Sequence, residues 1–129
     1  MKFICNEIQM GNQEFGCTIT FSENMNNGIS EEKLTFDEII DSIGTYIMLQ
    51  RTYAEDEFEE DYCYLESSDP EKSGEIENFE INLSRNQFVL NFEKEVYEIE
   101  LNLDTKIFEK LKENLKIITC EKGQLIFID

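Results

Sequence analysis

The residues best suited to chemistry lie in one acidic segment of this 129-residue chain. Six carboxylates surround one phenylalanine there, in the order Glu55, Asp56, Glu57, Phe58, Glu59, Glu60 and Asp61. Because like charges repel, a fold gains nothing from gathering so many of them. Three ligands suit such a segment: a hard cation, a basic protein, or a nucleic-acid-binding protein whose usual ligand it imitates. A role in solubility alone is the fourth interpretation.

The spacing does not indicate a specific calcium site. Calcium loops alternate oxygen ligands with small residues and place a glycine at the sharp turn. Residues 54–61 contain no glycine and no such alternation. We therefore expect no metal, and the segment favours a basic protein partner.

Catalysis has little support elsewhere in the chain. The sequence contains no histidine, which excludes Ser–His and Cys–His nucleophile pairs. The glycines form no phosphate-binding loop, and the cysteines lack the spacing of a zinc or iron–sulfur site. Paired carboxylates could act as they do in glycosidases, but 29 acidic residues produce such pairs by chance. We expect no enzyme and no cofactor.

The overall charge narrows the class of partner further. The formal net charge is −18, which disfavours direct contact with nucleic acid or anionic membranes and speeds association with basic proteins. The N-terminus has no apolar run typical of a signal peptide, and no stretch approaches the length of a membrane span. We expect a cytoplasmic protein of one domain, residues 1–129, with four ordinary buried thiols.

Alternating apolar and polar residues predict a chain rich in strands. Residues 15–21 alternate, and 3–10 is the expected hairpin partner, with a turn near Gly11-Asn12. A capping-box pattern predicts a short helix at 36–43. Strands at 46–49 and 61–67 flank the acidic segment, which makes 54–60 the connection of a second hairpin.

The second half of the chain predicts a meander followed by a helix. Three alternating runs are joined by short connections: 79–83, 88–92 and 97–103. Asp104 can cap a helix whose apolar residues share one side: Ile107, Phe108, Leu111 and Leu115. The predicted fold class is α+β, with a curved antiparallel sheet and the C-terminal helix on its apolar face.

Three features near the acidic segment have two interpretations each. We expect Phe58 to fold back onto its hairpin; the alternative is an apolar contact ringed by carboxylates. We expect Arg51 to form an ion pair with a carboxylate on a neighbouring strand, such as Glu66; the alternative is an interface residue. The outer face of the meander carries Glu80, Glu98 and Glu100, which form either a solvated face or an acidic docking surface.

Residues 46–92 also contain three motifs, "YIMLQR", "YCYLESSDPEKSG" and "ENFEINLSRNQFVLNF". Together they resemble the immunity protein 10 family of bacterial polymorphic toxin systems. The matching positions are Tyr46, Met48, Leu49, Gln50, Arg51, Tyr62, Tyr64, Glu66, Asp69, Leu83, Ser84, Asn86, Phe88 and Leu90. Pro70 departs from the family's usual glutamine.

The resemblance implies an α+β cytoplasmic protein that binds and neutralises a toxin delivered by a neighbouring cell. Our leading hypothesis is such an immunity protein, with residues 55–61 as the partner-binding region. The alternative is an acidic nucleic-acid mimic or adaptor that binds basic proteins through charge. A small enzyme with paired carboxylates is the third.

Overall fold

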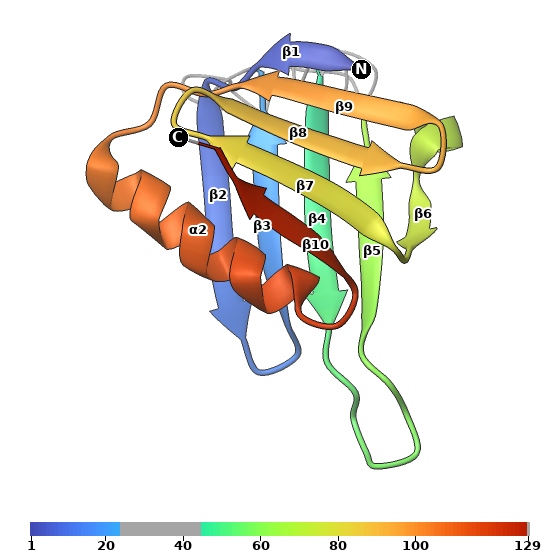
Figure 1. The fold of residues 1–129 in the computed structure, drawn as a ribbon. Helices are drawn as coiled ribbons and strands as arrows, with labels where there is room; N and C mark the ends of the chain where they lie inside the picture. The colour runs from blue at the N-terminus through green and yellow to red at the C-terminus, as the bar shows by residue number, and fades with distance from the viewer. Residues whose placement is uncertain (24–44, 129) are drawn as a thin grey trace, which may run out of the picture.

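The computed structural model describes residues 1–23 and 45–128, in which two five-stranded sheets face each other (Figure 1). The predicted α+β class is confirmed, and so is a helix near the C-terminus packed against a sheet. The helix expected at 36–43 lies outside the described residues. Within the described part of the chain, no helix is both long enough and apolar enough to cross a membrane.

The first sheet, called sheet B here, is antiparallel throughout. Its strands follow the order β2 (Glu7–Gln13), β3 (Gly16–Ser22), β4 (Tyr46–Thr52), β5 (Tyr62–Ser67) and β6 (Gly74–Ile76). Alternate residues of these strands face inward, as the period-2 pattern predicts. On β3 the inward residues Cys17, Ile19 and Phe21 are fully buried.

The other sheet, sheet A, contains the predicted meander. Its strands follow the order β1 (Lys2–Ile4), β9 (Glu95–Glu100), β8 (Gln87–Phe92), β7 (Phe79–Ser84) and β10 (Gly123–Phe127). The β7–β8–β9 pairs are antiparallel, whereas β1 and β10 lie parallel to β9 and β7. Two parallel strands must be joined by a long crossover. The chain from β7 to its parallel neighbour β10 passes through β8, β9 and the helix before β10 begins.

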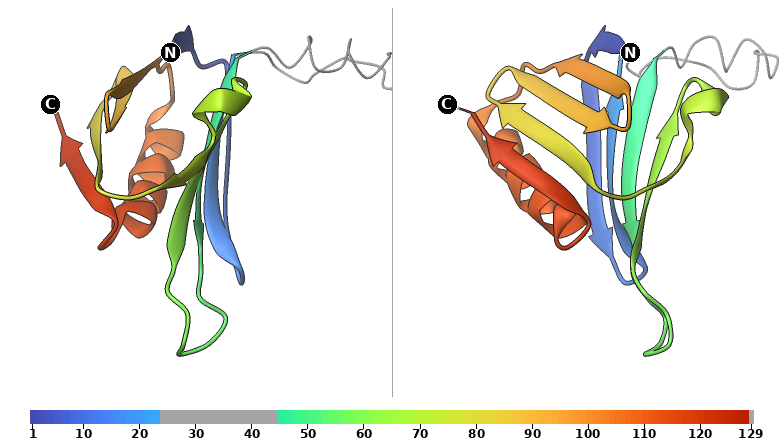
Figure 2. Two further views of the ribbon diagram at one scale, coloured as in Figure 1. Left: turned by 90° about the vertical axis from the view of Figure 1, so that its right-hand side faces the viewer. Right: turned by 45° about the vertical axis from the view of Figure 1, so that its right-hand side comes forward.

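Helix α2 (Thr105–Thr119) lies against the inner face of sheet B and beside β10 (Figure 2). It begins as predicted, because the Asp104 side chain accepts a hydrogen bond from the Ile107 amide at 2.8 Å. Phe108, Leu111 and Leu115 of the predicted apolar side are buried. A short 3-10 helix, η2 (Pro70–Lys72), lies between β5 and β6.

The β2–β3 hairpin turns at a different place from the one predicted. Its strands pair as far as Gln13 and Gly16, so the turn consists of Glu14 and Phe15, not of Gly11 and Asn12. Gly16 is required where β3 meets β4: a Cβ there would lie 2.5 Å from the carbonyl oxygen of Arg51. Phe15 therefore lies outside the strand and is 70% exposed.

Candidate partner-binding surface

The acidic segment forms the loop between β4 and β5, and this loop projects beyond the end of sheet B (Figure 1). Its backbone is held by its own side chains. A carboxylate oxygen of Asp56 accepts a hydrogen bond from the Phe58 amide at 2.9 Å, and Glu59 accepts one from the Glu55 amide at 3.3 Å. Residues 55–60 are all exposed.

Phe58 is 89% exposed, so the expectation that it folds back onto the hairpin is wrong. The four residues nearest to it in the loop, Asp56, Glu57, Glu59 and Glu60, all carry carboxylates. An aromatic ring held in water within a ring of charge is unfavourable in the free protein. The arrangement matches the alternative interpretation, an apolar contact ringed by carboxylates.

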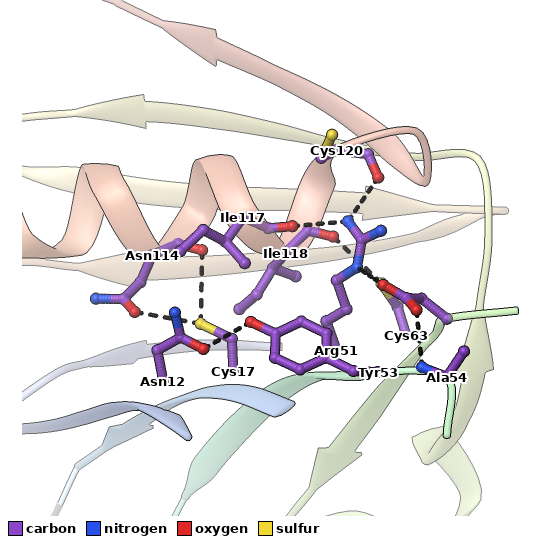
Figure 3. A network of polar contacts seen from close by, with 11 residues as sticks. Asn12, Cys17, Arg51, Tyr53, Ala54, Cys63, Asn114, Ile117, Ile118 and Cys120 are labelled. Carbon is purple, nitrogen blue, oxygen red and sulfur yellow. Dashed lines mark hydrogen bonds and ion pairs between the residues drawn. The ribbon is translucent and has the colours of Figure 1, made fainter. Parts of the chain in front are cut away.

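Arg51 joins the base of the loop to the end of helix α2 (Figure 3), and Asp61 of the loop forms an ion pair with Arg51. Arg51 is 9% exposed, and its Nε donates to Asp61 Oδ2 at 2.9 Å. Its Nη1 donates to the carbonyl oxygens of Ile117 and Cys120 at 2.7 and 2.6 Å. These carbonyls lie at the C-terminal end of α2, where carbonyl groups lack helical partners and the dipole favours a cation.

Asp61 differs from the other five acids of the segment. One of its oxygens accepts a hydrogen bond from the Ala54 amide at 2.8 Å, and the other binds Arg51. The Ala54 amide, followed by Arg51, holds the pKa of Asp61 below its usual value, against the raising effect of desolvation. Asp61 therefore supports the base of the loop and is partly buried, whereas Glu55, Asp56, Glu57, Glu59 and Glu60 are exposed.

The ion pair expected for Arg51 forms, but its partner is Asp61 and not Glu66, the carboxylate that we named as an example. Strand residues alternate between faces, and Arg51 lies on the inner face of β4 together with Ile47 and Leu49. Glu66 is paired with Met48, which lies on the outer face. The partner of Arg51 comes instead from the loop that precedes β5.

The β2–β3 turn lies at the same end of sheet B and is joined to the loop. The Tyr53 amide donates to the carbonyl oxygen of Phe15 at 3.0 Å, and the Tyr53 hydroxyl donates to Asn12 Oδ1 at 2.6 Å. Two exposed phenylalanines, Phe15 and Phe58, thus belong to one end of the molecule. The exposed residues of both tips are called the hairpin-tip surface: Glu14, Phe15, Glu55, Asp56, Glu57, Phe58, Glu59 and Glu60.

Sequence reasoning missed Phe15 and Glu14 as members of this surface. The alternating apolar positions of β3 continue back to Phe15, so the sequence predicted a strand that begins at Phe15. The strand begins one residue later, at Gly16. The signal that could have placed the turn is Gly16, because a glycine commonly follows a tight turn where the chain re-enters a sheet.

A shallow hollow on the outer face of sheet B adjoins this surface. Its volume is about 340 Å³, and Gln9, Gly11, Gln13, Phe15, Thr18 and Gln50 are among its lining residues. Every lining residue is uncharged, in contrast to the acidic loop. The hollow has room for a neutral or apolar side chain.

The described residues offer little to a metal ion. In residues 1–23 and 45–128, no group of three or more His, Cys, Asp or Glu side chains converges on one position.

On the outer face of the meander, Val89 of β8 separates Asn82 of β7 from Glu98 of β9, and Lys2 lies in register with Glu98 on the other side. The outer face of sheet A is therefore a mixed surface.

Comparison with known proteins adds no family assignment. No protein-family model matches the chain, and neither a curated protein nor a solved structure matches it. The resemblance to the immunity protein 10 family therefore stays a prediction. Its residues on β4 and β5 divide by face. The outer face of sheet B carries Tyr46, Met48, Gln50, Tyr62, Tyr64 and Glu66, and the inner face carries Leu49 and Arg51.

Proposed function

We propose that this chain is an immunity protein that neutralises a toxin domain by binding a basic surface of that domain with the hairpin-tip surface. The observation that carries the proposal is Phe58, fully extended into solvent from an acidic loop whose base is anchored by Arg51. The resemblance of residues 46–92 indicates the class of protein, an immunity protein, and the net charge of −18 indicates that the partner surface is positively charged.

Charge and apolar contact serve different steps of such binding. The carboxylates raise the rate at which a basic protein approaches, an effect that salt screens. Aromatic residues buried at the centre of an interface slow dissociation and resist salt. Phe15 and Phe58 are placed for the second task, since both are exposed at the end of the sheet that carries the acids.

Pre-organisation supports the same proposal. Binding costs less free energy when the contacting loop is already ordered. Asp56 and Glu59 bond the loop backbone, Arg51 fixes its base, and Tyr53 joins it to the neighbouring turn. The loop therefore presents its aromatic tip without a large loss of conformational entropy on binding.

An acidic nucleic-acid mimic or adaptor is the competing function. Such a protein acts through charge, so its binding should disappear at modest salt and extend to many unrelated basic proteins. Exposed phenylalanines and an uncharged hollow contribute nothing to binding of that kind. Their presence beside the acids favours a specific protein partner.

The proposal predicts that a neighbouring gene encodes a toxin domain, and the test is whether this chain protects cells that co-express that domain. Reversal of Glu57, Glu59 and Glu60 to lysine should abolish protection while the far-ultraviolet circular dichroism stays unchanged. The matched control reverses Glu80, Glu93 and Glu100, which changes the net charge equally but away from the tip. Equal protection by both variants would reject the hairpin-tip surface as the site, and no protection by the wild type would reject the proposal itself.

A further inference from the structure

The cations of this acidic protein gather around helix α2. The helix carries four lysines and two glutamates, and Arg85 of the β7–β8 turn lies against it. A local excess of positive charge is unexpected on a chain with a net charge of −18. It creates one region that an anion can approach despite the overall field.

A cavity of about 380 Å³ lies within this region, between the β7–β8 turn, the first half of α2 and the end of β10. Its walls combine apolar and charged groups. The apolar surface comes from Leu83, Phe108, Phe127 and Ile128. Two cations, Arg85 and Lys112, and one acid, Glu109, supply the charge, so the charged lining is positive on balance. Phe127 and Ile128 are 41% and 51% exposed, so the apolar part of the wall is open to a ligand.

The cations are held in position by the aromatic rings. The guanidinium of Arg85 lies 5.4 Å from the centre of the Phe108 ring and donates to the Thr105 hydroxyl at 2.9 Å. The ammonium of Lys112 lies 5.7 Å from the Phe108 ring and 5.2 Å from the Phe127 ring. Cation–π contacts of this kind restrain side chains that otherwise move freely in water.

Arg85 retains hydrogen-bonding capacity for an anion. A guanidinium has five N–H donors in a planar fork that matches a carboxylate. Among the residues that the structure describes, its side chain donates one hydrogen bond, to Thr105. Lys112 also lies 3.6 Å from Glu109, a pair in which the glutamate is 60% exposed and therefore weakly held.

We propose that this cavity binds a carboxylate attached to an aromatic or branched apolar group. The carboxylate lies against Arg85 and Lys112, and the apolar group lies against Phe127 and Ile128. Two sources share this chemistry: the C-terminus of a peptide, and a free aromatic or branched carboxylic acid. The β7–β8 turn and the end of β10, which line the cavity, lie at the opposite end of the molecule from the loop between β4 and β5 (Figure 1). The proposal is therefore independent of the proposed function.

The experiment follows amide chemical shifts of the isotope-labelled chain as N-acetylphenylalanine is added. The control ligand is N-acetylphenylalanine amide, which keeps the ring and lacks the charge. We expect the acid to bind at least about tenfold more tightly, since hydrogen bonds to a charged group are the strong ones here. The shifts should centre on residues 83–86, 108–112 and 127–128. A peptide that ends in phenylalanine then separates the sources: tighter binding than the small acid identifies a peptide terminus, and weaker binding identifies a free acid.

The variant Arg85→Gln with Lys112→Gln should weaken binding of the acid about tenfold or more. Lys2→Gln with Lys94→Gln is the matched control, which removes two cations elsewhere and should change affinity less than about twofold. If the first double variant fails to fold, Arg85→Gln alone replaces it, because Arg85 is exposed. Equal affinity for acid and amide, equal effects of the two double variants, or no saturable shifts would each overturn the proposal.

Discussion

Replacing Arg51 with methionine tests the anchor of the acidic loop. Methionine keeps the length and apolar contacts of the side chain but removes its charge and all its donors. Three partners lose their hydrogen bonds: Asp61 Oδ2 at 2.9 Å, the Ile117 carbonyl at 2.7 Å and the Cys120 carbonyl at 2.6 Å. Because Arg51 is 9% exposed, the substituted side chain leaves these groups partly desolvated.

The size of the effect follows from burial. Breaking a buried ion pair by removing one partner costs about 3–5 kcal/mol. The Asp61 side chain is 27% exposed and recovers some hydration, which lowers the expected cost to about 3 kcal/mol. At a urea slope of about 1.5 kcal/mol/M, the midpoint of unfolding should fall by about 2 M.

Urea unfolding followed by circular dichroism measures the change, since the chain contains no tryptophan. Arg85→Met is the matched control, the same substitution at an exposed arginine, and should cost less than about 1 kcal/mol. A double-mutant cycle with Asp61→Asn isolates the pair itself. If Arg51→Met costs less than about 1 kcal/mol, or no more than the control, the anchor does not stabilise the fold and the reasoning fails.

Three further outcomes are expected. The pKa of Asp61 is lowered in the folded state, so its contribution to stability is present above the unfolded pKa of about 3.9 and is lost as pH falls through the folded value. In Asp61→Asn, the free energy of unfolding should no longer show this acid-dependent loss, and a pH profile identical to that of the wild type would contradict the prediction. Gly16→Ala should lower the free energy of unfolding by about 2 kcal/mol, because the added Cβ meets a backbone oxygen. In the control Gly11→Ala the added Cβ meets nothing within 4 Å, and the free energy of unfolding should change by less than about 0.5 kcal/mol. Equal effects of the two variants in urea unfolding would count against the close approach at Gly16. Cys120 is exposed, so the expectation of four buried thiols is wrong for this residue, and it should react with a thiol reagent in the native protein. The other three cysteines, whose pKa values burial raises, should react only after unfolding, and more than one reactive thiol per native chain would disagree.

Alternation along the chain predicted most strands, because inward and outward residues differ in hydrophobicity at a period of two. Cys17, Ile19 and Phe21 are buried as that pattern requires, and Asp104 caps α2 as its type and position require. Local patterns of this kind are set by neighbouring residues and can be read from the sequence.

The assignment of strands to two sheets could not be predicted in the same way. It depends on contacts between distant segments, such as the parallel pairing of β10 with β7, whose residues lie more than forty positions apart (Gly123 with Phe79). The partner of Arg51 is a similar case. Arg51 lies on the inner face of β4, which excludes Glu66 on the outer face as its ion-pair partner. Asp61 comes within reach because of the course of the loop, which the sequence does not indicate.

The hairpin-tip surface was predicted in part. The charge of residues 55–61 identified its acidic half, because charge density is visible in the sequence. Its other half depends on where the β2–β3 turn falls and on the hydrogen bonds of Tyr53 to Asn12 and Phe15. Those bonds join residues about forty positions apart, and no local signal indicates them.

If this chain is an immunity protein, a neighbouring gene should encode its toxin domain, and calorimetric titration of that purified domain with this chain is the decisive measurement. We expect a complex that persists at about 0.5 M salt, where screening removes most surface electrostatics, and whose affinity falls at least about tenfold in Phe58→Ala. Binding that vanishes at modest salt and ignores Phe58 would contradict the proposal, as would no complex at low salt.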